Sequence, residues 1–420
     1  MSFQPKTNEE LKKAINNYCE NDDRSNGNIN DWDVSLIIDM DGVFRCKHCV
    51  DGCHRKIHLF NESLNNWNVS NVKGMSRMFS KCYYFNQSLN NWNVSNVTNM
   101  SFMFYKCTNF NQPLDNWNVS NVVNMHGMFY ECLNFNQSLD KWNVSNVTNM
   151  IYVFRKCSNF NQPLNNWNVS NVTNMHGMFY DCKKFNQSIN NWNVSNVTNM
   201  GHMFYRCCVF NQPINNWNVS NVTNMSSMFS CCYDFNQPIN NWNVSNVTDM
   251  NSMFSYCEKF NQPINDWNVS NATDMGCMFF GCFIFNQPIN NWNVSNVAYM
   301  NSMFSLCHNF NQPINNWNVS NVINTSYMFY GCKELIKSYK EQFYMTNINK
   351  KNKYALDELQ KDISIIKIYY MAKDKEFIMN NINNNQKNKI QNFIKNMTKD
   401  ICELCYLQSE CINNICGLCS

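Results

Sequence analysis

The sequence predicts an α/β repeat solenoid of leucine-rich-repeat-like coils, each a short parallel strand, a turn and a short helix, with helical caps. Two observations support this fold class. Tryptophan recurs at intervals of 25 residues from Trp67 to Trp317. The apolar residues around each of these tryptophans occupy the same offsets in every copy. A segment this short cannot bury its own apolar side, so successive coils must stack and share one core.

One copy is enough to predict the elements of a coil in order. Residues 235–259 read FNQPINNWNVSNVTDMNSMFSYCEK, and positions are given below as offsets from the tryptophan. The alternation of apolar and polar residues in Ile-Asn-Asn-Trp-Asn-Val predicts a strand. Ser-Asn-Val-Thr has the composition of a turn. Met-x-x-Met-Phe-x-x-Cys places apolar residues at i, i+3, i+4 and i+7, which predicts two turns of helix.

The repeat also sets the predicted domain boundaries. Residues 1–27 contain an amphipathic segment, 7–20, which we expect to form an N-terminal capping helix with Thr7 or Asn8 as its N-cap. Residues 28–335 form the solenoid of about twelve coils, which starts with a degenerate copy and carries a Cys/His insertion at 46–58. Residues 336–400 are rich in Lys and Asn and predict a helical tail, and residues 401–420 form a Cys-rich C-terminus.

Composition and motifs exclude several classes of function. The net charge of +3 is small for 420 residues, so we expect no nucleic-acid partner. No run of about 18 apolar residues predicts a membrane span. The first residues lack the apolar region of a signal peptide, so we expect an intracellular protein whose cysteines are mostly thiols. The sequence contains no Gly-rich phosphate loop, Gly-x-Ser-x-Gly or His-Glu-x-x-His, and we therefore expect that it is not an enzyme.

Residues 160–182, FNQPLNNWNVSNVTNMHGMFYDC, resemble the BspA-like leucine-rich-repeat surface-protein family, in the branch first named from Mycoplasma lipoproteins. The resemblance covers residues 28–335 and implies a leucine-rich-repeat solenoid. Such repeats occur in bacterial adhesins, in protists and in large DNA viruses of amoebae. The Asn- and Lys-rich tail and the missing export signal favour an intracellular or viral member. It would then be found in the host cytoplasm, or in the virion if it is viral.

Cysteines occur in two patterns. The cysteine at Trp+15 recurs in all eleven evenly spaced copies, and we expect a line of buried thiols because single cysteines cannot surround a metal tetrahedrally. Two further clusters break the period, and their spacing makes zinc a candidate cofactor, chiefly at the C-terminus. Free thiols are the alternative for both. The candidate ligands are Cys46, Cys49, Cys53 and His54 in the insertion, and Cys402, Cys405, Cys416 and Cys419 at the C-terminus.

The period leaves some positions free to vary, chiefly Trp+9, +10, +13, +14, +16 and +17. Charges of opposite sign alternate at Trp+14 from Lys106 to Arg206, which predicts a ladder of ion pairs between neighbouring coils. Tyr at Trp+13 gives a large contact area with a polar end, which suits a binding face. The alternative is a solvated edge with scattered aromatic residues. The candidate binding residues are Tyr105, Tyr130, Tyr180, Tyr205, Tyr256, Phe280, Phe283 and Ile284.

These observations favour a non-enzymatic repeat scaffold that mediates protein–protein interaction, with a protein as its partner. A structural or assembly component of a virion or cell structure is the first alternative. A glycan-binding adhesin is the second. The sequence specifies neither the identity of the partner nor the oligomeric state.

Overall fold

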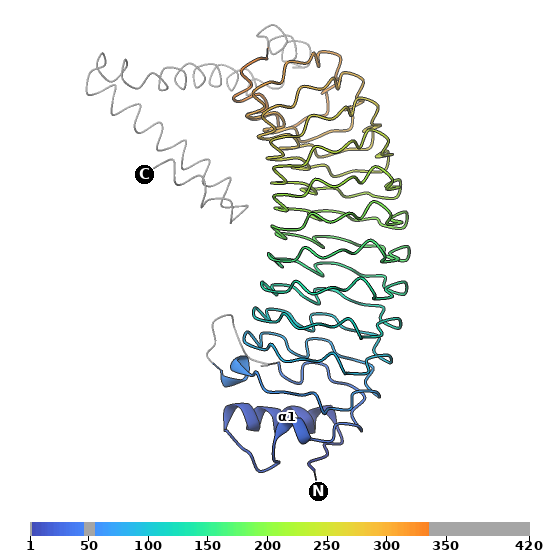
Figure 1. Ribbon diagram of the computed structural model, residues 1–420. Helices are drawn as coiled ribbons and strands as arrows, with labels where there is room; N and C mark the ends of the chain where they lie inside the picture. The colour runs from blue at the N-terminus through green and yellow to red at the C-terminus, as the bar shows by residue number, and fades with distance from the viewer. Residues whose placement is uncertain (1, 46–54, 336–420) are drawn as a thin grey trace, which may run out of the picture. The chain divides into compact units, whose positions relative to one another are not determined.

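The computed structural model describes residues 2–45 and 55–335. The predicted helical tail and the candidate zinc ligands Cys46, Cys49, Cys53, His54, Cys402, Cys405, Cys416 and Cys419 lie outside these residues. The described elements are the helix α1 (Asn8–Glu20) and the short 3₁₀ helices η1 (Ile29–Asp31) and η2 (Lys56–Leu59). The remaining described chain winds into stacked coils (Figure 1).

Helix α1 covers the first coil of the stack. The Thr7 side chain caps it by accepting a hydrogen bond from the Glu10 backbone N–H, at 3.1 Å. Leu11, Ala14, Ile15 and Tyr18 form its buried face. The sequence places a helix over nearly the same residues. The helix shields the apolar end of the solenoid, which has no preceding coil to cover it.

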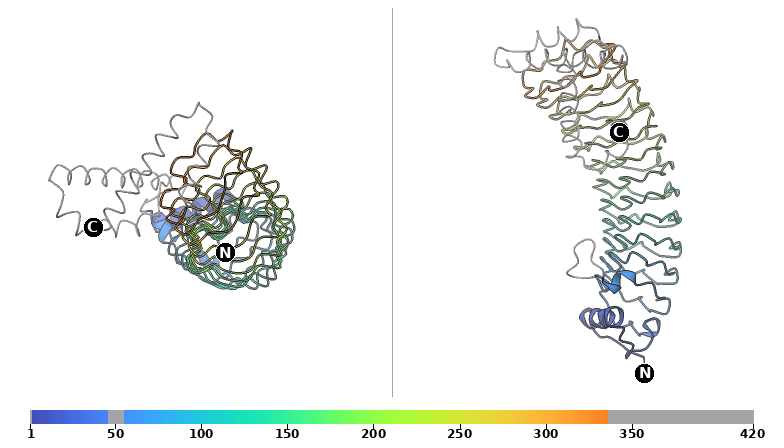
Figure 2. Two further views of the ribbon diagram at one scale, coloured as in Figure 1. Left: turned by 90° about the horizontal axis from the view of Figure 1, so that it is seen from above. Right: turned by 90° about the vertical axis from the view of Figure 1, so that its left-hand side faces the viewer.

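Eleven isolated parallel bridges join twelve consecutive coils, from Asp39 in coil 1 to Asn324 in coil 12. Each bridge joins the residues at Trp+7 of two neighbouring coils, where coil 1 contains Trp32 and coil 2 contains Trp67. Seen along the stack, successive coils follow nearly the same path (Figure 2). The described residues therefore form a repeat solenoid with one coil for each tryptophan.

The coils contain neither the predicted strand nor the predicted helix in the described residues. The Trp segment contains a turn, in which the Trp242 N–H donates to the Ile239 carbonyl at 3.1 Å, and the Met-x-x-Met-Phe-x-x-Cys segment is a series of turns. In coils 2–12 the residues at Trp+10 and Trp+14 have positive φ, as at Arg77 (55°) and Lys81 (69°). This left-handed conformation ends an α-helix, so two such residues within five positions exclude one.

Hydrogen bonds between coils explain this unusual backbone. The N–H groups at Trp+8, +10, +12 and +14 donate to carbonyls of the next coil. In coil 3, for example, Phe102 N–H donates to the carbonyl of His126 at 2.7 Å, and Phe104 N–H to that of Met128 at 2.9 Å. In a helix these N–H groups would bond to the carbonyl four residues earlier instead. The left-handed residues turn alternate N–H groups toward the neighbouring coil, and the strain is offset by bonds made along the whole stack.

The core is a set of parallel ladders of identical side chains. The apolar residues of the repeat are almost all less than 9% exposed, as the pattern predicts. Neighbouring tryptophan rings stack at 6.2–6.5 Å, and the Phe at Trp+12 stacks on the Phe at Trp−7 of the following coil at 4.1–4.2 Å. Each ring meets the same neighbours in every coil, so one packing solution is repeated along the solenoid.

Polar side chains bond the coils where the backbone does not. The Trp192 indole N–H donates to the carbonyl of Leu164 in the preceding coil at 2.9 Å, and Cys182 Sγ donates to the carbonyl of Phe154 at 2.9 Å. The Asn at Trp−6 accepts the backbone N–H of its counterpart in the next coil, as Asn161 does from Asn186 at 2.9 Å. These contacts satisfy groups that are buried between the coils, and the cysteines form the line of buried thiols that the sequence predicts.

Glycine alternates with large residues at Trp+10. Phe102 and Tyr152 occupy this position in coils 3 and 5, and Gly127 and Gly177 occupy it in coils 4 and 6. A Cβ on Gly127 would lie 2.6 Å from the ring of Phe102, and a Cβ on Gly177 would collide with the ring of Tyr152. Each aromatic ring therefore lies over a glycine of the next coil. This contact explains why aromatic residues and glycine alternate at Trp+10 in coils 3–6.

Deletion should respect the 25-residue unit. Removing residues 236–260 joins equivalent positions of adjacent coils, so a folded and shorter solenoid is expected. Removing only 12 residues shifts every core ladder out of register and should prevent cooperative unfolding. Circular dichroism and thermal unfolding would measure both variants. Equal tolerance of the two deletions would contradict the stacked-coil architecture.

The Gly177→Ala substitution should lower the free energy of unfolding by about 2–4 kcal/mol, because it adds a Cβ against Tyr152 at a residue with φ of 56°. Gly27→Ala is the matched control, since Gly27 has φ of 75° but no atom near its missing Cβ. That variant should lose only about 1 kcal/mol. Adding Tyr152→Ser to Gly177→Ala should recover part of the loss. A Gly177 variant no less stable than the Gly27 variant would disprove the ring contact.

Truncation of the tryptophan ladder should cost far more than truncation of the cysteine ladder. Trp192→Ala removes two ring stacks and the hydrogen bond to Leu164, and about 3–5 kcal/mol is expected. Cys182→Ala removes a small side chain and one S–H donor, so a loss of about 1–2 kcal/mol is expected. Denaturant unfolding would compare the two. Equal losses would show that the cysteine ladder matters more than its contacts indicate.

Candidate functional site

The residues at Trp+9, +10, +13 and +14 vary between coils, as do those at Trp+16 and Trp+17, and we call the first four positions the variable strip. The constant positions of the repeat are fixed by a contact: the apolar ones by the core and the asparagines by hydrogen bonds. At Trp+13 the residues include Ser80, Tyr105, Arg155 and Phe280. The strip follows the line of backbone hydrogen bonds between coils, and its side chains lie one above another along the stack.

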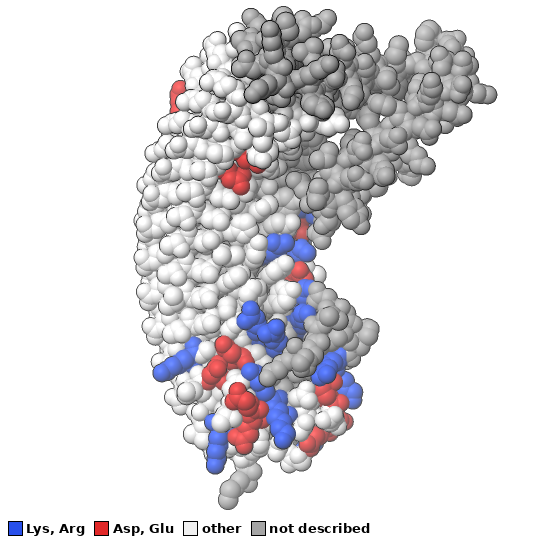
Figure 3. Space-filling model, turned by 180° about the vertical axis from the view of Figure 1, so that it is seen from behind, with Lys and Arg blue, Asp and Glu red and all other residues white. Residues whose placement is uncertain are grey.

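The charged residues of the solenoid are unevenly placed. In Figure 3, Lys, Arg, Asp and Glu gather over the N-terminal coils and along the hollowed side, and most of the rest of that face is uncharged. Within the variable strip, opposite charges pair between coils. Glu131 lies 3.7 Å from Lys106 and 3.5 Å from Lys156, and Asp181 lies 3.6 Å from Arg206. The predicted ladder of ion pairs is present, with side chains less exposed than expected.

Four of the predicted binding residues lie together in coils 3–7. The rings of Tyr105 and Tyr130 are 5.0 Å apart, and those of Tyr180 and Tyr205 stack at 4.5 Å. Their exposure differs from the expectation, because Tyr205 is buried and the other three are half-buried. Each packs against the next coil, so these tyrosines stabilise the strip and present only their outer edges to a partner.

Arg155 and Tyr152 belong to the same cluster, although the sequence pattern did not predict them. The Arg155 guanidinium carbon lies 4.0 Å from the ring centre of Tyr180, 4.7 Å from that of Tyr152 and 5.1 Å from that of Tyr130. In the sequence, Arg155 interrupts the run of Tyr at Trp+13, so the sequence alone does not suggest that it packs with the tyrosines. The glycines at Trp+10 of coils 4 and 6 are the available signal that large rings lie over them.

Three histidines complete the cluster. His176 Nε2 lies 2.9 Å from the Tyr152 hydroxyl, and the rings of His176 and His202 are 5.2 Å apart. Burial lowers the pKa of His202 to about 4, and burial also lowers the pKa of His126 and of His176. All three are therefore neutral at pH 7 and add hydrogen-bonding groups without adding charge.

The other predicted binding residues form a separate group in coils 9–11. The rings of Tyr256 and Phe280 are 5.0 Å apart and perpendicular, and Phe283 stacks on His308 at 5.1 Å. Ile284 is 41% exposed, so it is the most accessible of the set. Coil 8 carries Ser226, Ser227 and Ser230 in the strip and separates this group from the tyrosine cluster. The structure thus places the eight residues in two patches.

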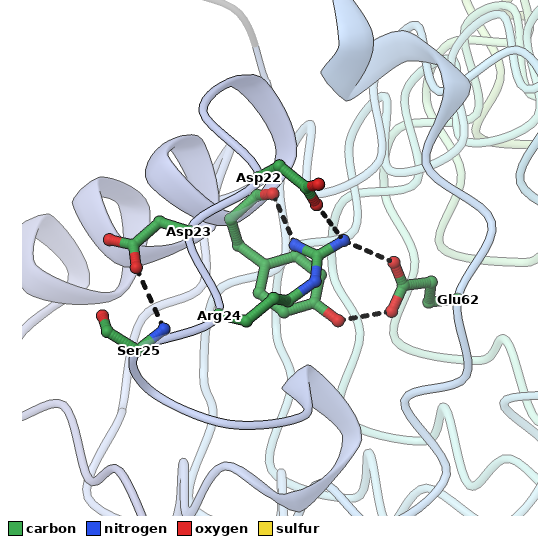
Figure 4. Close-up of polar contacts among 6 residues, drawn as sticks. Asp22, Asp23, Arg24, Ser25 and Glu62 are labelled. Atoms are coloured by element: carbon green, nitrogen blue, oxygen red, sulfur yellow. Dashed lines mark hydrogen bonds and ion pairs between the residues drawn. The ribbon is translucent and has the colours of Figure 1, made fainter.

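A further charged cluster joins α1 to the first coils (Figure 4). Arg24 lies over the ring of Tyr18 at 3.6 Å, donates to the Tyr18 carbonyl at 2.7 Å and pairs with Asp22 at 2.8 Å and Glu62 at 3.6 Å. The Tyr18 hydroxyl donates to Glu62, and burial and this carboxylate raise the pKa of Tyr18 to about 12. Every group has a partner, so the cluster holds the cap in place.

The cysteines and the other potential metal ligands of the described residues are dispersed or buried. No three His, Cys, Asp or Glu residues are close enough there to hold a metal ion. Burial raises the pKa of the Cys182 thiol well above its ordinary value, and its neighbours in the cysteine ladder behave alike. Such thiols stay protonated and unreactive at neutral pH. Among the described helices, none is long and apolar enough to span a bilayer.

Comparison with known proteins identifies the repeat. The family model described as "Mycoplasma protein of unknown function, DUF285" matches residues 11–138, 112–207, 188–283 and 264–366. No curated protein matches the chain.

Two solved structures show a distant likeness to the chain. The T. pallidum leucine-rich-repeat protein TpLRR is 13% identical, with 47% of this chain and 75% of that one covered and a TM-score of 0.24. The TLR13–ssRNA13 complex is 10% identical, with 80% and 49% covered and a TM-score of 0.26. Since the four matches to the family model together span residues 11–366, the chain belongs to the DUF285 family of repeat proteins of unknown function.

Proposed function

We propose that the protein is a non-enzymatic scaffold that binds a protein partner through the variable strip. One observation carries this proposal: sequence variation is concentrated between Trp+9 and Trp+17, the stretch of the coil that contains the strip. The core ladders and the asparagine bonds account for the constant positions. Packing alone does not require Arg, Tyr, Ser, Phe and Gly to exchange at the same place. Variation of this kind is typical of the binding face of a repeat protein.

The physical properties of the strip also suit a protein partner. Half-buried tyrosines keep a fixed orientation, so little side-chain entropy is lost when a partner contacts their edges. Charged residues beside them supply orientation and steering. The backbone of the strip donates four hydrogen bonds from each coil to the next, as from Met100, Phe102, Phe104 and Lys106. A rigid surface of this kind is preorganised for binding.

Assembly into an ordered structure is the second candidate. The side of the coils that carries Asn at Trp+1 and Trp+4 is nearly identical from coil to coil, and these asparagines are exposed. Their amides bond their own turn or the preceding coil, as Asn196 Nδ2 does to the Ser170 carbonyl at 2.7 Å. A flat, uniform surface favours side-by-side packing of solenoids. Light scattering across a range of protein concentrations would detect such self-assembly.

The Tyr130→Ser and Tyr180→Ser double variant should no longer bind the protein partner. Serine already occupies Trp+13 in coils 2, 8, 9 and 11, so the variant should fold, although Arg155 then packs on fewer rings and the melting temperature should fall by a few degrees. The measurement is capture of interacting proteins from the native host cell, quantified by mass spectrometry. Proteins retained by wild type should fall at least about tenfold.

Lys141→Asn is the matched control for this capture. Lys141 is 77% exposed on another side of coil 5, and most coils carry Asn at the same position. The control should retain the partners at wild-type levels. If the double variant also retains them, the strip is not the binding face. If wild type forms large ordered particles and retains no protein, the assembly function is correct instead.

A further inference from the structure

The variable strip divides into a basic half and an uncharged half. In coils 8–12 its positions hold no Lys, Arg, Asp or Glu. In coils 2–7 it holds two acidic residues, Glu131 and Asp181, and three times as many basic ones. The basic residues are Arg77, Lys81, Lys106, Arg155, Lys156 and Arg206. A partner of complementary charge would therefore be acidic and would lie along the N-terminal half.

Arg155 differs from the other cations at the centre of this half. Lys106 and Lys156 pair with Glu131, and Arg206 pairs with Asp181. Arg155 makes no ion pair within the described residues and lies against three tyrosine rings instead. Its Nε is buried and has no hydrogen-bond partner there. Arg155 therefore keeps a charge that no carboxylate of the described residues neutralises, and a carboxylate is the acceptor that best matches a guanidinium.

His202 supplies a second group beside it. Its Nδ1 is buried and also has no hydrogen-bond partner among the described residues. Its ring lies 6.2 Å from the ring of Tyr180, which in turn contacts Arg155. Coils 5 and 7 thus place two unsatisfied polar atoms on either side of a tyrosine in coil 6. Both can donate to an oxygen, since a neutral imidazole carries its proton on either nitrogen.

We propose that coils 3–7 of the variable strip bind an acidic, extended segment of the protein partner, with Arg155 as the group that receives one of its carboxylates. This inference rests on the proposed function and names the chemistry of the partner. From Lys106 to Arg206 the strip crosses four coil intervals, or about 19 Å at the usual spacing of paired backbones. An extended peptide of about six residues spans that length.

An acidic peptide fits this surface better than a nucleic acid. Proteins that bind single-stranded nucleic acid offer aromatic faces on which bases can stack. Here Arg155 covers the face of Tyr180, and the rings of Phe102 and Tyr152 lie over the glycines of the next coil. The two carboxylates in the strip would also repel a continuous line of phosphates, whereas a peptide carries acidic residues only at chosen positions.

The test uses a fluorescein-labelled peptide of about twelve alternating Glu and Ser residues, with the full-length protein and anisotropy as the readout, at about 50 mM salt. The same peptide with Gln in place of Glu, and oligo(dT) of similar length, are the comparison probes. Arg155→Ser is the informative variant, because other coils carry Ser at Trp+13 and the chain should still fold with it. Lys141→Asn removes the same charge from the same coil away from the strip.

The Glu peptide should bind the wild type, and Arg155→Ser should weaken it at least about tenfold while Lys141→Asn changes it less than about twofold. The Gln peptide should bind more weakly than the Glu peptide by a similar factor. Equal losses of affinity in both variants would mean that binding depends only on the net charge of the protein, and this would overturn the proposal. So would stronger binding of oligo(dT), or no binding of the Glu peptide up to about 1 mM. If cellular partners still require Tyr130 and Tyr180 in that case, the scaffold function stands and only the acidic partner is wrong.

Discussion

The backbone hydrogen bonds between neighbouring coils are the interaction on which the rest of this structure depends. They require the residues at Trp+10 and Trp+14 to adopt positive φ in each of coils 2–12, although most of these residues are not glycine. An isolated residue in this conformation costs about 1–2 kcal/mol. The conformation persists because each N–H then meets a carbonyl of the next coil, as Lys106 does with Tyr130 at 2.7 Å. A single coil would gain none of these bonds and could not keep this shape alone.

The same constraint creates the variable strip. Left-handed residues turn the chain so that the side chains at Trp+11 and Trp+12 enter the core, as Met178 and Phe179 do, while those at Trp+9, +10, +13 and +14 line its edge. The edge positions then meet only their counterparts in adjacent coils. The edge side chains of neighbouring coils must therefore be complementary in size and charge. This explains why the ring of Tyr152 lies over Gly177 of the next coil and why Glu131 lies between two lysines. Because only adjacent coils have to match, the order of residue types along the whole strip can still change.

The sequence predicted the solenoid and its core because those depend on period alone. Trp192, Phe204 and Cys182 are buried at the offsets expected from the repeat. The strand and the helix were predicted wrongly. The apolar spacing of Met-x-x-Met-Phe-x-x-Cys fits two turns of helix as well as it fits the series of turns that the structure contains. Glycines occur at both left-handed positions and could have corrected the helix prediction: Gly127 and Gly177 at Trp+10, and Gly281 and Gly331 at Trp+14. Contacts across coils, such as Arg155 on Tyr180, could not be derived from one coil.

The aromatic residues of the candidate site also contribute to the stability of the strip. Tyr180 packs against Tyr205 and Arg155, and so its ring is part of the strip's own packing before any partner arrives. A repeat built from small residues at Trp+13, as in coils 8 and 9, keeps the same backbone bonds without these rings. The aromatic cluster of coils 3–7 is therefore not required by the solenoid itself. It adds a rigid, donor-rich surface over one stretch of an otherwise uniform stack, and that local departure from uniformity is the strongest physical reason to place recognition there.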